Sequence, residues 1–139
     1  MGNLIEQLKQ RYQHLSKQNI TSLLELYDEN ILFCDPLHRL QGKSKLQQYF
    51  EYLLQNTRHC EFRFHDTIEQ HERACLSWTM TFTHPRLAKG SPIDVHGCSL
   101  LHFSRRITQH CDYFDVSTML HDHIPLVGKL SRFIKLRAG

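Results

Sequence analysis

The apolar residues of this sequence change their spacing near residue 60, and this change constrains the fold more than any other feature. Before it, apolar side chains recur at helical intervals in three segments, at 4–15, 20–26 and 46–54. After it, they alternate with polar side chains, as in "LSWTMTF" from Leu76 to Phe82. A period of two predicts strands with one buried face, and successive strands of this kind predict an antiparallel sheet. The expected class is therefore α+β, with three N-terminal helices followed by a sheet.

The remaining strand signals are short apolar runs at 31–34, 95–103 and 107–114. Three helices packed against one curved, mostly antiparallel sheet would form a cone, and a cone with an open end encloses an apolar pocket. The chain has the length of one domain, with no internal repeat and no linker. We therefore expect a single domain over residues 1–139.

Composition excludes several classes of protein. A formal net charge of +3 provides no electrostatic footprint for nucleic acid. No apolar run has the length of a membrane span, and the N-terminus lacks the apolar core of a signal peptide. The expected location is cytoplasmic.

The cysteines fit the same location. They are Cys34, Cys60, Cys75, Cys98 and Cys111, an odd number with no C-x-x-C pair. Most lie inside apolar runs, so we expect reduced cysteines in the core rather than disulfides or a zinc site.

A carboxylate, Asp35, ends the apolar run at 31–34 and is followed by Pro36. A carboxylate in an apolar pocket is desolvated, which would raise its pKa toward the working pH of a general base. An Asp before Pro also commonly caps the turn that follows. The sequence leaves both interpretations open.

Two stretches resemble the nuclear-transport-factor-2-like (NTF2-like) superfamily, which includes ketosteroid isomerases and SnoaL-like polyketide cyclases. They are "LYDENILFCDPLHRLQGKSKLQQYF" (26–50) and "IDVHGCSLLHFSRRITQHCDYFD" (93–115). The resemblance implies the cone-shaped fold, a small apolar ligand, no cofactor, and a homodimer formed through the sheet. This fold supports enzymes and non-enzymes alike.

The resemblance also implies site residues. Asp35 falls where the isomerases keep their general base, and Tyr12 falls close to their oxyanion tyrosine. Ser99 occupies the position of their second oxyanion donor, a protonated aspartic acid. Asp112 matches the strand that carries a catalytic aspartate in the cyclases, and His110 and Phe114 share its pocket-lining face.

Each of these residues also has a structural interpretation. Tyr12 lies on an apolar helix face, where a tyrosine is usually part of the core. Asp112 and His110 could form an acid–base dyad or a buried structural pair. The apolar residues expected to line the pocket are equally typical of a core; they are Trp78, Met80, Phe82, Leu101 and Phe114.

The C-terminal stretch "PLVGKLSRFIKLR" predicts a short basic amphipathic helix at about 124–137. It can close the pocket mouth, pack on the sheet or, less commonly, contact an anionic membrane surface. His121 and His123 lie just before it, but an H-x-H pair without matched ligands does not predict a metal site.

Two functional hypotheses follow. The first is a cofactor-free isomerase, cyclase or hydratase that acts on a small, mostly apolar carbonyl compound with Asp35 as the general base. Asp112 with His110 would be a second acid–base group, and Tyr12 with Ser99 would be polar donors. The alternative is a module that binds an apolar ligand or a protein without chemistry.

Overall fold

The computed structural model describes residues 3–57, 59–86 and 88–117. The predicted helix at 124–137, with His121 and His123, lies outside the described residues. The helices are α1 (Leu4–Tyr12), α2 (Ile20–Leu24), α3 (Lys43–Asn56) and a 3-10 turn (Ala88–Gly90). The strands are β1 (Tyr27–Cys34), β2 (Arg39–Gln41), β3 (His59–Gln70), β4 (Arg73–Thr83), β5 (Ile93–Phe103) and β6 (Ile107–Phe114).

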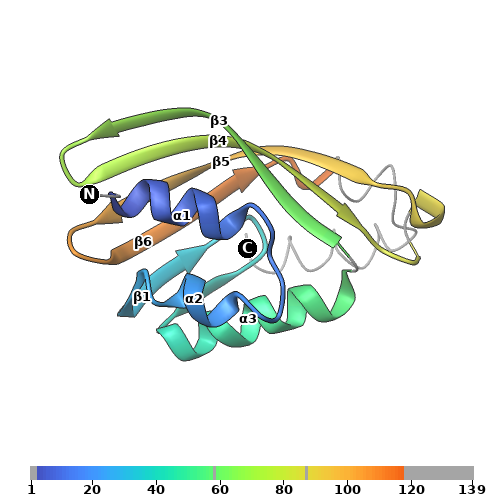
Figure 1. Ribbon diagram of the computed structural model, residues 1–139, viewed down its shortest axis with the longest axis horizontal. Helices are drawn as coiled ribbons and strands as arrows, with labels where there is room; N and C mark the ends of the chain where they lie inside the picture. The colour runs from blue at the N-terminus through green and yellow to red at the C-terminus, as the bar shows by residue number, and fades with distance from the viewer. Residues whose placement is uncertain (1–2, 58, 87, 118–139) are drawn as a thin grey trace, which may run out of the picture.

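All strands belong to one sheet with the order β2-β1-β6-β5-β4-β3. The neighbouring pairs are antiparallel except for β1 and β6, which run parallel. The predicted α+β class with a mixed, mostly antiparallel sheet is therefore confirmed. Two parallel strands cannot be joined by a tight turn and need a long crossover. For β1 and β6 this crossover is the whole chain between them, which includes α3 and the strands β2 to β5 (Figure 1).

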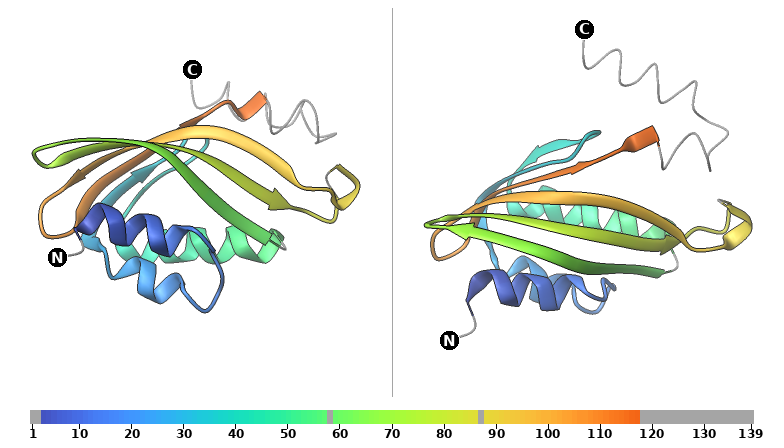
Figure 2. Two further views of the ribbon diagram at one scale, coloured as in Figure 1. Left: turned by 45° about the horizontal axis from the view of Figure 1, so that its top comes forward. Right: turned by 90° about the horizontal axis from the view of Figure 1, so that it is seen from above.

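The helices lie on one face of the curved sheet, which we call the inner face, as the two views of Figure 2 show. Helix α1 begins at Asn3, whose side chain accepts a 2.7 Å hydrogen bond from the backbone N–H of Glu6. Such an N-cap contributes about 1 kcal/mol to helix stability. The helix buries Ile5, Leu8 and Tyr12 toward the sheet.

Alternation along the strands separates the inner face from the outer face. Trp78, Met80 and Phe82 of β4 point inward and are buried, as their spacing predicts. Leu101 of β5 is fully buried beside them. None of the helices in the described part of the chain is long and apolar enough to cross a membrane.

The cysteines differ from the prediction. Cys34 and Cys111 are register partners in the β1–β6 pair, and they form a disulfide with a Cα–Cα distance of 4.6 Å. The expectation that all five cysteines are reduced is therefore wrong. Its reasoning considered spacing along the chain, but these residues are 77 positions apart and meet only through the parallel pairing. Cys60, Cys75 and Cys98 are free thiols.

Candidate functional site

A buried imidazole forms the centre of a hydrogen-bond network on the inner face. His110 of β6 is 2% exposed. Its Nδ1 lies 2.8 Å from the hydroxyl of Tyr27 on β1, and its Nε2 lies 2.7 Å from Oδ1 of Asp112. The parallel pairing of β1 with β6 brings Tyr27 and His110 together. It sets Tyr27 opposite Ile107 and Phe33 opposite His110.

The network extends in two directions from His110 and Asp112. On one side, the hydroxyls of Tyr27 and Tyr12 lie 3.1 Å apart. On the other side, Ser99 of β5 donates its hydroxyl to Oδ1 of Asp112 at 2.5 Å. The indole N–H of Trp78 donates to the Ser99 oxygen at 2.8 Å.

The hydrogen-bond directions can be assigned for the case in which Asp112 is ionised and the His110 ring is neutral. An ionised Asp112 can only accept, so Nε2–H of His110 donates to it. In a neutral ring Nδ1 then accepts from Tyr27, and Tyr27 accepts from Tyr12. Both arms of donors therefore end on one oxygen, Oδ1 of Asp112.

The other oxygen of Asp112 is available. Oδ2 has no hydrogen-bond partner among the described residues, and no polar side-chain atom in that part of the chain is both buried and unpaired. The Asp112 side chain is 14% exposed. Within the described part of the chain, the network holds Asp112 by Oδ1 and leaves Oδ2 without a partner.

Asp112 borders a small cavity beneath α1. The space open to the centre of a water molecule is about 10 Å³, which is room for about one water. The cavity is lined by Leu8, Tyr12, Phe62, Phe64, Leu76, Trp78, Ser99, His110 and Asp112. Its walls are mostly apolar, and its polar groups come from the network.

The predicted pocket residues divide into two groups. Trp78, Ser99, Tyr12, His110 and Asp112 meet at the cavity. The other apolar candidates lie outside the cavity lining: Met80, Phe82 and Leu101 are buried in the core, and Phe114 packs against Trp78 with ring centroids 6.3 Å apart.

Asp35 also lies outside the cavity lining. Its Oδ1 accepts backbone N–H bonds from Leu37 at 2.8 Å and His38 at 2.7 Å. Its Oδ2 accepts the hydroxyl of Tyr49 at 2.6 Å, and the His38 imidazole lies 3.0 Å from Oδ1. This is the turn cap that the sequence left open as the alternative.

The expectation of a raised pKa for Asp35 is wrong. Burial alone would raise the pKa of this carboxyl. The hydrogen bonds from His38, Tyr49 and the Leu37 backbone, together with the charge of His38, outweigh burial and lower the pKa below its ordinary value. The free carboxylate oxygen beside the cavity belongs to Asp112 instead.

The tyrosines of the network remain protonated over the working pH range. Burial, as the largest cause, raises the pKa of Tyr12 well above its ordinary value, and burial also raises the pKa of Tyr27. Both hydroxyls can therefore serve as hydrogen-bond donors.

Sequence reasoning gave no site role to Tyr27. It lies within the stretch 26–50 that resembles the family, at the start of the acidic segment before the apolar run at 31–34. A signal was present in its type, because a fully buried tyrosine requires a partner for its hydroxyl. The partner, His110, comes from a strand 83 positions away.

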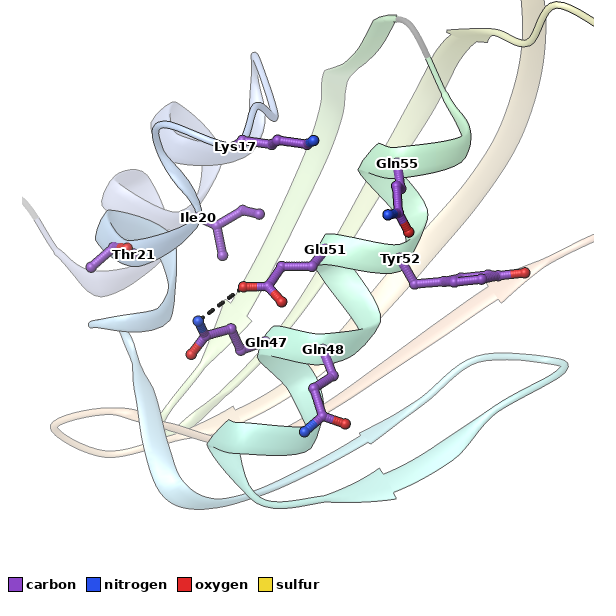
Figure 3. Close-up of a pocket in the computed structure, with 8 residues that line it drawn as sticks. All are labelled: Lys17, Ile20, Thr21, Gln47, Gln48, Glu51, Tyr52 and Gln55. Atoms are coloured by element: carbon purple, nitrogen blue, oxygen red, sulfur yellow. Dashed lines mark hydrogen bonds between the residues drawn. The ribbon is translucent and has the colours of Figure 1, made fainter.

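A second hollow lies on the surface between α2 and α3 (Figure 3). Its lining includes exposed side chains of α3, where Gln47 donates to Glu51 one turn farther along the helix at 3.0 Å. Polar groups of this kind are solvated, and the hollow lacks the mostly apolar walls that surround the cavity beneath α1. Among the described residues there is no group of three or more His, Cys, Asp or Glu side chains that could hold a metal ion.

Comparison with solved structures identifies the fold. A protein with a ketosteroid isomerase-like fold from Catenulispora acidiphila DSM 44928, solved with trimethylamine, superposes with a TM-score of 0.76 at 12% identity, covering 88% of this chain and 94% of that one. A candidate SnoaL-like polyketide cyclase from Shewanella putrefaciens CN-32 gives 0.70 at 18% identity, covering 86% and 92%. An LEH-like epoxide hydrolase from M. tuberculosis gives 0.68 at 15% identity, covering 84% and 83%.

At these identities the likeness establishes the NTF2-like fold alone. No curated protein matches this sequence. The family model of the SnoaL-like domain matches residues 8–110, which is most of the chain and includes Tyr12, Tyr27, Ser99 and His110. The chain therefore belongs to the SnoaL-like domain family.

Proposed function

We propose that this protein is a cofactor-free acid–base enzyme that acts on a small, mostly apolar carbonyl compound at the cavity beneath α1. Asp112 is its general base. One observation carries the proposal: Oδ1 of Asp112 accepts from His110 and Ser99, whereas Oδ2 is unpaired among the described residues and Asp112 borders the cavity. Asp112 thus replaces Asp35 as the first choice for the base.

The walls of the cavity that Asp112 borders are mostly apolar, so a mostly apolar ligand can lie beside the carboxylate, within reach for proton transfer. His110 holds the carboxylate in one orientation through Oδ1. Tyr12 borders the cavity, and its hydroxyl can turn from Tyr27 toward an oxygen on which negative charge develops.

The size of the cavity favours the hydratase form of this chemistry over the isomerase and cyclase forms. A space of about 10 Å³ accommodates one water beside Asp112. Asp112 would take a proton from that water as the water oxygen adds to the β-carbon of an enone, and would return it to the α-carbon, so that a C–O and a C–H bond replace the C=C double bond. Because the cavity has room for the water alone, the enone would lie at the exposed edge of Asp112. The epoxide hydrolase among the structural relatives also adds water, although its likeness concerns the fold.

The experiment uses a panel of small cyclic and open-chain enones. Water addition and deuterium incorporation next to the carbonyl are followed by NMR in D₂O. We expect D112N to lower turnover about 100-fold or more while retaining ligand binding, because a general base contributes about 10²–10⁴-fold. The matched D35N variant should retain most of its turnover. Equal losses in both variants, or loss in D35N alone, would refute the assignment.

The alternative is a binding module. In a binding module, the hydrogen-bond network of His110 and Asp112 would stabilise the core and would take no part in proton transfer. Ligand-induced NMR shifts at the cavity, combined with no turnover of any panel member by the parent protein, would support it over the enzyme.

A further inference from the structure

The outer face of the sheet carries a row of apolar side chains that crosses five strands. In register, the row contains Cys34 of β1, Cys111 of β6, Leu100 of β5, Cys75 of β4 and Ile68 of β3. Leu100 is 39% exposed and Ile68 is 69% exposed. The described helices lie on the other face of the sheet (Figure 2).

Three more residues widen this row into the outer patch. Leu32 lies two positions before Cys34 on β1, and Tyr113 lies two positions after Cys111 on β6; both are exposed. Cys98 lies two positions before Leu100 on β5, diagonally from Cys75 and Cys111. Cys75 and Cys98 lie within hydrogen-bond distance of each other. Burial, followed by the interaction with Cys75, raises the pKa of the Cys98 thiol. A contiguous exposed apolar surface of this kind is typical of an interaction site.

The same chain offers an occupant with a matching face. Residues 118–139 continue from β6 beyond the described part, and Leu126, Leu130, Phe133 and Ile134 recur at helical spacing within them. A helix with this spacing has one apolar stripe. Residue 135, a lysine, falls on the opposite side of the same helix.

The connection is long enough. β6 itself contributes Cys111 and Tyr113 to the outer patch, and it ends at Phe114. The eight residues 118–125 can span up to about 26 Å when extended. The row across five strands is about 19 Å wide. A tethered segment of this reach has a high effective concentration over the patch, which a separate molecule lacks.

Charge favours the same pairing. The segment 124–139 holds four of the seventeen Lys and Arg residues and none of the fourteen Asp and Glu residues. The rest of the chain therefore has a small net negative charge. Glu61 and Asp94 lie on the outer face in register with Thr81, six positions along β4 from Cys75, and they offer carboxylates to the far end of the basic segment. The same face also carries Arg63, and Arg39 lies in register with Cys34, so charge supports the docking less than the apolar match does.

From these observations we propose that residues 124–137 form an amphipathic helix that docks on the outer patch of its own chain. Its stripe of Leu126, Leu130 and Phe133 covers the apolar row, and its basic side chains face solvent and the outer-face carboxylates. The helix would occupy the face through which the expected homodimer would form, so it replaces that expectation. The proposal does not depend on catalysis at Asp112.

The two free thiols of the patch report whether it is covered. The rates at which Cys75 and Cys98 react with a maleimide are measured in the full-length protein, and the labelled sites are located by peptide mass spectrometry. We expect a double variant, Leu130→Asp with Phe133→Asp, to raise both rates at least tenfold. The matched control, Lys135→Asp, should leave them unchanged.

Two outcomes would overturn the proposal. Equal rates in the parent and the double variant would show that the segment does not cover the patch. Parent rates that rise on dilution, together with a dimer mass that dissociates over the same range, would show that a second copy covers it. The emission of Trp78, the single tryptophan, verifies that each variant keeps its fold.

A reciprocal variant tests the other side of the contact. Leu100→Asp places a charge in the apolar row and should release the segment, so trypsin should cleave after Lys129 and Arg132 several-fold faster. Unchanged cleavage in a folded Leu100→Asp protein would count against docking at this row.

Discussion

Tyr27 and His110 are 83 positions apart in the chain, and the Tyr27 hydroxyl lies 2.8 Å from Nδ1 of His110 in the buried core. This contact fixes the orientation of the imidazole from one side, while Asp112 holds it from the other at 2.7 Å. The candidate base is therefore positioned by residues from both ends of the domain.

Replacing Tyr27 by Phe should destabilise the protein by about 1–3 kcal/mol. The ring would still fill its site, but Nδ1 of His110 would lose its partner while buried. Urea unfolding measures the change. Tyr113→Phe, at a tyrosine that is 54% exposed, is the control and should change stability by less than about 0.5 kcal/mol. Similar effects at both sites would contradict the network.

The lowered pKa of Asp35 predicts a pH-dependent contribution to stability. The folded-state pKa lies below the unfolded value, so the unfolded state binds the proton more readily. The contribution is fully present above the unfolded pKa of about 4 and is lost as the pH falls through the folded pKa. D35N should therefore be less stable than the parent at pH 7, and the difference should shrink in acid. A difference that grows below pH 4 would reverse the sign and refute the assignment.

The disulfide between Cys34 and Cys111 should stabilise the protein by about 4 kcal/mol, because it closes a loop of 77 positions. Adding a phosphine reductant should move the urea midpoint of the parent to a lower concentration. The variant with Ala at both positions should be insensitive to the reductant. A parent midpoint that does not move would mean that the two thiols are not paired in solution.

Gly97 should not tolerate a side chain. A Cβ at this position would lie 2.5 Å from Cη2 of Trp78 and 2.7 Å from the backbone oxygen of Tyr113. Gly97→Ala should cost about 1–3 kcal/mol through overpacking. It should also shift Trp78 emission, because the indole must leave its place above the glycine. An unchanged spectrum and midpoint would show that the ring is not held there.

The sequence predicts the fold class because the relevant signal is local. Trp78, Met80 and Phe82 alternate with polar residues, and each lies on the inner face as a period of two requires. The length of β1 was less well predicted: the apolar run indicated residues 31–34, but the strand begins at Tyr27. Its polar residues 28–30 conceal it from a hydrophobicity pattern.

The candidate site was harder to predict because its contacts are distant along the chain. For Asp35 the sequence already offered both the turn cap and the pocket. The choice depends on Tyr49 and on the position of the cavity, neither of which a local pattern shows. The Cys34–Cys111 pair and the Tyr27–His110 contact both require the parallel register of β1 with β6, which alternation does not encode.

That register also sets the order in which the molecule can assemble. β1 emerges early during synthesis, but its partner in the sheet interior, β6, is the last of the described strands to be made. Pairing of such high sequence separation forms slowly, since the loop must close before the contacts are gained. Until residue 114 has left the ribosome, the nascent chain can pair β1 with β2 but leaves the other edge of β1 open, and chaperones bind such exposed strand edges.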